Sequence, residues 1–174
     1  MITQKEDRYD KLISYGVPKE FLDGINSSKQ DEELEYLLVA PDGSYFYLKD
    51  ICNQYSILKG YEITPIYEGA NGDTFWVLLS NEEEYKFVHF ELEQDEIYDD
   101  YGKNFNHLLA DFIIKFYESA VDLELEEIIK RSAKLGFVNA NKFLHALQEA
   151  DKNGLRKTFE TDDQWRAENI KLYI

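Results

Sequence analysis

The chain has 174 residues with 35 acidic and 19 basic side chains, which give a formal net charge of −16 at pH 7. A field of this sign repels nucleic acid and anionic lipid and attracts basic partners, so it argues against direct binding to DNA, RNA or a membrane surface. The length, and the apolar side chains that recur along the whole sequence, predict a single compact domain over residues 1–174.

Two short helices and a hairpin are predicted at the start of the chain. Apolar residues at helical spacing indicate a helix over residues 9–13, and Pro18 is well suited to the first turn of a second helix. Residues 36–40 and 45–48 are rich in aliphatic and aromatic side chains and flank a Pro-Asp-Gly-Ser sequence. This pattern predicts a strand, a tight turn and a second strand.

Three further extended runs predict most of a sheet, at residues 61–67, 74–79 and 85–92. Pro65 in the first run predicts an edge position or an irregularity in the ladder, because proline has no amide hydrogen to donate. Asn71 and Gly72 form a strong hairpin signal before the second run, since both residues tolerate positive φ. An acidic turn at residues 80–84 joins the second run to the third.

Helical spacing returns in the last third of the chain. Asn104 can cap a helix with a broad apolar stripe. The stripe consists of Phe105, Leu108, Leu109, Phe112, Ile113 and Phe116. Asp122 can cap another helix that Gly136 ends, and residues 141–151 and 161–172 predict two more, the last opening with a capping-box sequence. The predicted fold class is α+β, an antiparallel meander flanked by N-terminal helices and several C-terminal helices.

Residues that could support catalysis or bind a metal are few and scattered. Cys52 is the only cysteine, and His89, His107 and His145 are far apart, so the clustered spacing of a zinc site is missing. No nucleophile motif is present, and the acidic residues 95–102 lack the ligand and glycine positions of an EF-hand loop. We therefore predict no catalytic residue and no metal site.

The sequence shows no sign of export. Residues 1–10 are charged rather than apolar, and no apolar run approaches the roughly 20 residues that span a bilayer. Cys52 alone cannot form an intrachain disulfide, and we interpret it as a buried, inert thiol. We therefore expect a cytoplasmic protein.

The order of residues in the centre of the chain resembles that of a known family. A Pro-Ile strand, a glycine-containing turn that ends in Gly-Asp and an aromatic strand follow one another over residues 63–76. The residues that carry this pattern are Pro65, Ile66, Gly69, Asn71, Gly72, Asp73, Phe75 and Trp76. With the proline-led helix at residues 16–22 and the run from His89 to Phe112, the pattern resembles the SUKH superfamily, also called Smi/Knr-type proteins. The match covers about residues 5–118, and residues 119–174 would be a helical C-terminal extension.

The resemblance implies a non-enzymatic binding protein without a cofactor. In bacteria it implies an immunity protein that binds and neutralises a cognate toxin, often a nuclease or a nucleic-acid deaminase. In fungi it implies an intracellular scaffold or regulatory protein linked to cell-wall synthesis or signalling, which we keep as the alternative hypothesis. An enzyme that acts on a small molecule is a third class. A neighbouring toxin gene would favour immunity, and an isolated gene would favour regulation.

The acidity is concentrated in one stretch. Residues 1–118 hold 25 acidic and 10 basic side chains, a net −15, against −1 for residues 119–174, which hold 10 and 9; residues 82–100 alone carry −8. A nuclease needs a basic surface for phosphate, so an acidic inhibitor would be steered to a basic toxin. The predicted partner-binding residues are Glu82, Glu83, Glu84, Asp95, Glu96, Tyr98, Asp99, Asp100 and Tyr101. The two tyrosines are included as anchors because acidic neighbours predict that their segment is exposed. The competing interpretation is a solvated face that keeps the protein soluble.

Overall fold

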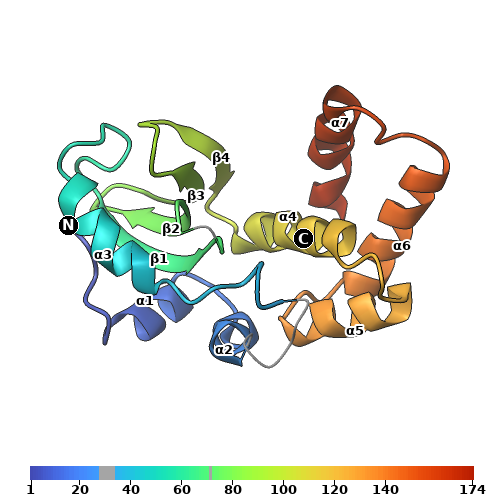
Figure 1. Cartoon of the computed structure of the whole chain (residues 1–174), viewed down its shortest axis with the longest axis horizontal. Coiled ribbons are helices and arrows are strands. Elements are labelled where there is room, and N and C mark those ends of the chain that lie inside the picture. The colour runs from blue at the N-terminus through green and yellow to red at the C-terminus, as the bar shows by residue number, and fades with distance from the viewer. Residues whose placement is uncertain (28–33, 71) are drawn as a thin grey trace. The chain divides into compact units, whose positions relative to one another are not determined.

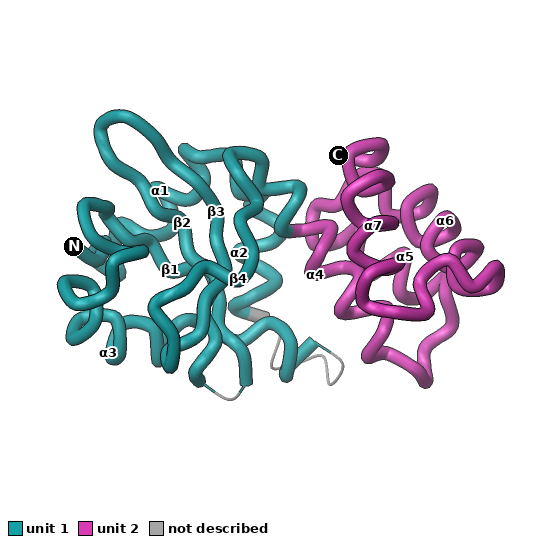
Figure 2. Tube along the Cα trace, turned by 90° about the horizontal axis from the view of Figure 1, so that it is seen from above, with its two compact units in different colours: residues 1–108 teal, residues 109–174 magenta. Residues whose placement is uncertain are grey.

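A computed structural model describes residues 1–27, 34–70 and 72–174 (Figure 1). The chain divides into two compact units, residues 1–108 and 109–174 (Figure 2). The first unit contains α1 (Arg8–Ser14), α2 (Lys19–Ser27), α3 (Asp42–Ile51), β1 (Glu62–Glu68), β2 (Thr74–Ser80), β3 (Tyr85–Glu91) and β4 (Ile97–Gly102). Helix α4 (Phe105–Ser119) begins in the first unit. The second unit continues with α5 (Leu125–Lys134), α6 (Ala140–Lys152), α7 (Phe159–Asn169) and a 3-10 turn (Ile170–Leu172).

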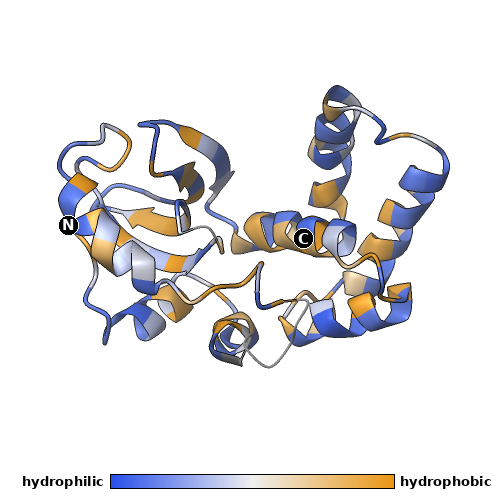
Figure 3. Ribbon diagram, in the orientation of Figure 1, coloured by the Kyte–Doolittle hydropathy of each residue, from blue (hydrophilic) through white to orange (hydrophobic). Residues whose placement is uncertain are grey.

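The four strands form one antiparallel meander in the order β1-β2-β3-β4, with helices before and after it. The predicted α+β fold class is confirmed. β2 and β3 each contain consecutive buried residues, and because successive strand residues point to opposite faces, these residues supply both sides of the sheet. Figure 3 shows hydrophobic residues along β2. The prediction of a single domain stays a prediction, because a division into compact units does not test whether they unfold together.

One face of the sheet packs against α3 and the loop that follows it. Phe75, Val77 and Phe90 of the sheet form a buried cluster with Leu48 of α3 and with Cys52. Cys52 is a buried free thiol, as predicted.

The other face of the sheet is covered by aromatic residues of two helices. The ring of Phe21 in α2 lies 5.8 Å from that of Tyr67 in β1 and 5.1 Å from that of Phe105, measured between centroids. Phe105 in turn lies 5.3 Å from Phe87 of β3. These edge-on contacts fix α2 and the first turn of α4 against the sheet.

The predicted strand-turn-strand over residues 36–48 is wrong, because residues 42–51 form α3. The carboxylate of Glu68, at the end of β1, accepts hydrogen bonds from the backbone N–H groups of Gly43 (3.1 Å) and Ser44 (2.7 Å) and from the Ser44 hydroxyl (3.0 Å). A carboxylate at this position stabilises a helix N-terminus. A Cβ at Gly43 would lie 2.9 Å from a Glu68 oxygen, so glycine permits this close approach. Tertiary contacts therefore overrode the strand preference of the local sequence.

The remaining predictions for the sheet are confirmed where the structure describes them. β1 is an edge strand, and its register to β2 shifts between Pro65 and Tyr67. Gly72 has a φ of +72° in the β1–β2 turn, whereas Asn71 lies outside the described residues. β4 was not predicted as a strand.

Helix boundaries in the last third differ from the predictions by a few residues. Asn104 accepts a hydrogen bond from the backbone of Asn106 (3.0 Å) and caps α4 as predicted. The predicted cap at Asp122 is wrong, because α5 begins after Glu124. The capping box of α7 begins at Thr158, three residues before the predicted position, and pairs it with Thr161.

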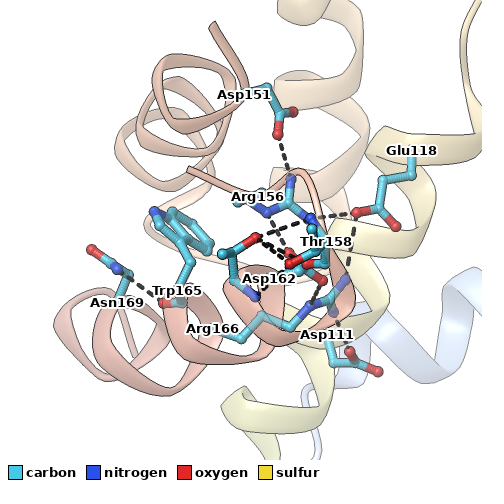
Figure 4. A network of polar contacts seen from close by, with 10 residues as sticks. Asp111, Glu118, Asp151, Arg156, Thr158, Asp162, Trp165, Arg166 and Asn169 are labelled. Atoms are coloured by element: carbon cyan, nitrogen blue, oxygen red, sulfur yellow. Dashed lines mark hydrogen bonds and ion pairs between the residues drawn. The ribbon is translucent and has the colours of Figure 1, made fainter. Parts of the chain in front are cut away.

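A network of charged side chains holds the second unit together (Figure 4). Arg156, whose side chain is 3% exposed, contacts the carboxylates of Glu118 (2.5 Å), Asp151 (3.0 Å) and Asp162 (2.5 Å). Arg166 contacts Asp162 at 2.6 Å. These contacts join α4, α6 and α7 within the unit.

Candidate functional site

The acidic stretch predicted as one surface lies at three places along the sheet. The β2–β3 turn carries Glu82, Glu83 and Glu84, the β3–β4 turn carries Glu93, Asp95 and Glu96, and β4 carries Asp99 and Asp100. The two turns lie at opposite ends of β3, which at ~3.4 Å per residue places them about 20 Å apart. This separation is about twice the Debye length of ~10 Å at 0.1 M salt. The two turns therefore act as separate charged groups at physiological ionic strength.

The β2–β3 turn is ordered by its own residues. The side-chain oxygen of Asn81 accepts hydrogen bonds from the backbone N–H groups of Glu83 and Glu84, both at 2.9 Å. The carboxylate of Glu84 also accepts a hydrogen bond from the hydroxyl of Tyr61. The glutamates themselves are exposed.

The second acidic group follows the outer strand of the sheet. We call it the β4 edge, and it consists of Glu93, Glu96, Tyr98, Asp99 and Asp100. The side chains of Asp99 and Asp100 are 47% and 48% exposed, Tyr98 is 44% exposed, and both glutamates are exposed. Asp100 pairs with Lys86 at 3.2 Å, and Asp99 pairs with Nδ1 of His89 at 2.7 Å. The β4 edge therefore combines several solvent-facing carboxylates with one half-exposed aromatic ring.

Two of the predicted binding residues have structural contacts instead. Asp95 accepts hydrogen bonds from the backbone N–H groups of Ser56 (2.8 Å) and Ile57 (3.1 Å), and these bonds lower the pKa of its carboxyl group. Tyr101 is only 8% exposed, so the prediction that it is exposed is wrong, although the same prediction for Tyr98 is confirmed. A buried ring cannot be reached by a partner without rearrangement of β4.

Stacked rings connect the β4 edge to the rest of the sheet. Trp76 of β2 stacks on Tyr67 of β1 with centroids 4.4 Å apart and on His89 of β3 at 4.5 Å, with interplanar angles of 7° and 6°. The ring of Tyr98 lies 5.7 Å from that of His89. The row of neighbouring rings thus contains one ring from each of the four strands. The His89 contact with Asp99 was not predicted, because it depends on the register of a strand that the sequence did not reveal.

The family-like residues build the sheet rather than an exposed surface. Pro65 and Ile66 lie in β1, Gly69, Gly72 and Asp73 lie in the β1–β2 turn, and Phe75 and Trp76 lie in β2. Phe75 is fully buried and Trp76 is 7% exposed. The backbone N–H of Gly69 donates to the carbonyl of Thr74 (2.9 Å) and closes the hairpin. The described residues of this set therefore form part of the sheet and its first hairpin.

Each unit has a surface hollow. A hollow of about 490 Å³ is lined by the ion-paired Lys11 and Glu62, and another of about 430 Å³ in the second unit is lined by Tyr117 and Asp151. Neither is lined by a histidine or by Cys52. Among the residues that the structure describes, no three His, Cys, Asp or Glu side chains are placed to share a metal ion.

Comparisons of the chain with family models, with curated proteins and with solved structures found no match. No helix within the described ranges is both long and apolar enough to cross a membrane.

Proposed function

We propose that this protein is a non-enzymatic binding protein that neutralises a toxin with a basic surface, and that the toxin binds at the β4 edge. The observation that carries the proposal is the row of exposed carboxylates beside the half-exposed ring of Tyr98. Tyrosine rings are frequent binding anchors because they bury a large area and lose few rotatable bonds. The carboxylates give such an anchor an electrostatic preference for basic partners.

The charge of the first unit supports fast capture of a basic toxin. Residues 1–108 hold 23 acidic and 9 basic side chains, a net −14. Complementary fields raise association rates above the ordinary ~10⁵–10⁶ M⁻¹s⁻¹, up to about 10⁸–10⁹ M⁻¹s⁻¹ at low salt. An inhibitor that must intercept a toxin before it reaches nucleic acid gains from this acceleration.

The surroundings of His89, whose ring has a carboxylate partner at 2.7 Å, support a structural role for this histidine. Its ring is 8% exposed and lies against Trp76, and its Nε2 atom is buried. A general base must come within hydrogen-bond reach of the proton that it removes. The burial of Nε2 therefore favours a binding protein over an enzyme.

The order of family-like motifs supports a more specific form of the proposal. It favours an immunity protein of SUKH type that acts in the cytoplasm against a nuclease or deaminase toxin. The alternative from the same resemblance, a scaffold or regulatory protein of Smi/Knr type, would use the same binding surface without a toxin.

Co-expression tests this function directly. The toxic domain encoded beside the gene is induced in cells with and without the protein, and growth is followed. We expect growth to be restored by the wild-type chain and not by an unrelated protein of equal charge. Absence of rescue, together with absence of a complex between the purified proteins, would refute the immunity function.

A further inference from the structure

The two edge strands of the sheet differ in how their outer sides are covered. Along β1, the backbone N–H of Ile63 donates to the Met1 carbonyl (2.8 Å), and the N–H of Thr3 donates to the Ile63 carbonyl (2.9 Å). The N–H of Glu68 donates to the Val39 carbonyl (3.1 Å). The outer side of β1 is therefore already paired at both ends.

A partly buried arginine contacts the middle of the same edge. Nε of Arg8 donates to the carbonyl of Pro65 (2.7 Å), and its guanidinium also donates to the carbonyl of Ile66. Pro65 has no amide hydrogen and could not pair with a further strand in any case. Together these contacts leave β1 unsuited to receive another strand.

β4 is different, because within the described ranges no strand and no isolated bridge adds to its outer side. Side-chain contacts to its backbone lie at its C-terminal end, where Nδ1 of the His107 ring lies 3.3 Å from the Tyr101 carbonyl oxygen and the backbone N–H of Gly102 donates to the Asp100 carboxylate (2.9 Å). The register of β4 to β3 shifts twice, before Val88 and after His89. Such irregularities and charged side chains are what natural proteins use to prevent uncontrolled pairing of an exposed edge.

We propose that the outer edge of β4 pairs with an extended basic segment of the toxin, which adds a fifth strand to the sheet. This inference rests on the proposed function and specifies the mode of recognition. In such pairing the backbone hydrogen bonds supply affinity, and the side chains beside them supply specificity.

The charges on β4 determine which kind of strand can pair with its outer edge. Like charges placed directly opposite one another across a strand pair are destabilising, and opposite charges are stabilising. A second copy of this chain would bring Asp99 and Asp100 against the same carboxylates, so the edge disfavours self-pairing. A strand with lysine or arginine on both of its faces would instead meet Asp99 on one face of the sheet and Asp100 on the other, with the Tyr98 ring beside it.

Nuclear magnetic resonance of the complex tests this pairing. The protein is labelled with ¹⁵N and ¹³C, and an inactivated form of the toxin domain encoded beside the gene is added unlabelled. We expect nuclear Overhauser contacts between the backbone protons of residues 97–102 and backbone protons of the toxin. We also expect hydrogen exchange of the β4 amides to slow at least tenfold, while exchange in β1 is unchanged.

The outcomes separate this inference from the function on which it rests. A complex that forms without backbone contacts or protection at β4 would overturn strand pairing and leave the immunity function standing. Failure to form any complex would overturn both. Backbone contacts at β4 with an acidic or neutral toxin segment would overturn the part of the inference that assigns a basic strand.

Discussion

Carboxylates in the two units of this protein have opposite surroundings. In the second unit, Asp111, Glu118, Asp151 and Asp162 surround two arginines, Arg156 and Arg166 (Figure 4). Along the β4 edge, Asp99 pairs with His89 and Asp100 with Lys86, both carboxylates stay about half exposed, and the glutamates are exposed. The net charges of the two units differ in the same way. Residues 109–174 hold 12 acidic and 10 basic side chains, a net −2, whereas residues 1–108 carry a net −14.

The difference teaches that an acidic residue can be assigned to folding or to binding only from its partners. Carboxylates that satisfy a buried arginine stabilise the fold, because the arginine would otherwise be a buried, uncompensated charge. Exposed carboxylates contribute little to stability, and their field extends to an approaching partner. Substitutions in the arginine network and at the exposed acidic residues test whether each group serves folding or binding.

The largest expected effect is the loss of the arginine at the centre of the network. Arg156→Ala leaves Glu118 and Asp162 with Arg166 and leaves Asp151 without an arginine, so we expect a loss of unfolding free energy at the lower end of the ~3–5 kcal/mol that breaking a buried pair costs. Urea denaturation measures the loss. Trp165 lies 5.4 Å from Arg156, so its fluorescence in a Trp76→Phe background reports on the second unit.

An exposed ion pair in the same unit supplies the matched control. Lys130 contacts Glu127 at 3.2 Å with a side chain that is 61% exposed. Lys130→Ala should lower the unfolding free energy by less than about 0.5 kcal/mol. Equal losses for Arg156→Ala and Lys130→Ala would show that the network adds no more than a surface pair.

The next effect concerns two tyrosines of β4 that the sequence could not distinguish. Tyr101 is 8% exposed, so Tyr101→Ala should lower the unfolding free energy by about 3 kcal/mol, as for other large buried aromatic residues. Tyr98→Ala should cost less than about 1 kcal/mol and should instead raise the dissociation rate of the toxin complex. Chemical denaturation and surface plasmon resonance on both variants measure these effects. A reversed order of stabilities would contradict the assignment of Tyr101 to the core.

Periodicity in the sequence was sufficient to predict most of the fold. The meander through β3, the irregularity at Pro65 and the helix that Asn104 caps follow from local patterns. The helix α3 could not be predicted, because it is stabilised by Glu68, a residue 24 positions away from Ser44. Long-range contacts of this kind leave no local signal.

The candidate site was predicted only in part, for a related reason. A net charge over residues 82–100 contains no information on which carboxylates share a surface, because an antiparallel turn sends them to opposite ends of a strand. Neither does it show that Asp95 binds two backbone amides. The strand β4 was missed because two adjacent aspartates, residues that strands disfavour, interrupt its aromatic residues.

A smaller effect is expected from charge reversal, which tests the separation of the two acidic turns. The double variant Glu93→Lys and Glu96→Lys and the double variant Glu82→Lys and Glu83→Lys change the net charge equally, and all four side chains are exposed. Stability should change by less than about 0.5 kcal/mol per substitution. At about 0.1 M salt, the first variant should associate with the toxin about tenfold more slowly, and the second should be slowed less, because only the Asp100 end of β4 lies near the β2–β3 turn.

Salt dependence provides the internal control for this pair of variants. At about 0.01 M salt the Debye length of ~30 Å exceeds the spacing of the turns, so both variants should associate slowly. At about 1 M salt both should approach the wild-type rate. Equal rates for the two variants at about 0.1 M, measured by stopped-flow mixing, would show that the toxin is not placed at the β4 edge.

The smallest effect concerns Asp95. This residue lies in the acidic stretch of the sequence, but its carboxylate makes hydrogen bonds within the fold. Hydrogen bonds from the backbone of Ser56 and Ile57 lower the pKa of Asp95 below its ordinary value of about 3.9. At a pH between the folded-state and the unfolded-state pKa of Asp95, the unfolded chain binds more protons than the folded chain. The contribution of Asp95 to stability is therefore present above the unfolded-state pKa of about 3.9, and it is lost as the pH falls through the folded-state pKa. Asp95→Asn should therefore destabilise the protein at about pH 7 and should converge with the wild type as the pH falls through the folded-state pKa of Asp95. Glu96→Gln, the exposed neighbour, should leave the urea midpoint unchanged at both pH values. A pH-independent difference for Asp95→Asn would contradict the role of its charge in joining the β3–β4 turn to the loop after α3.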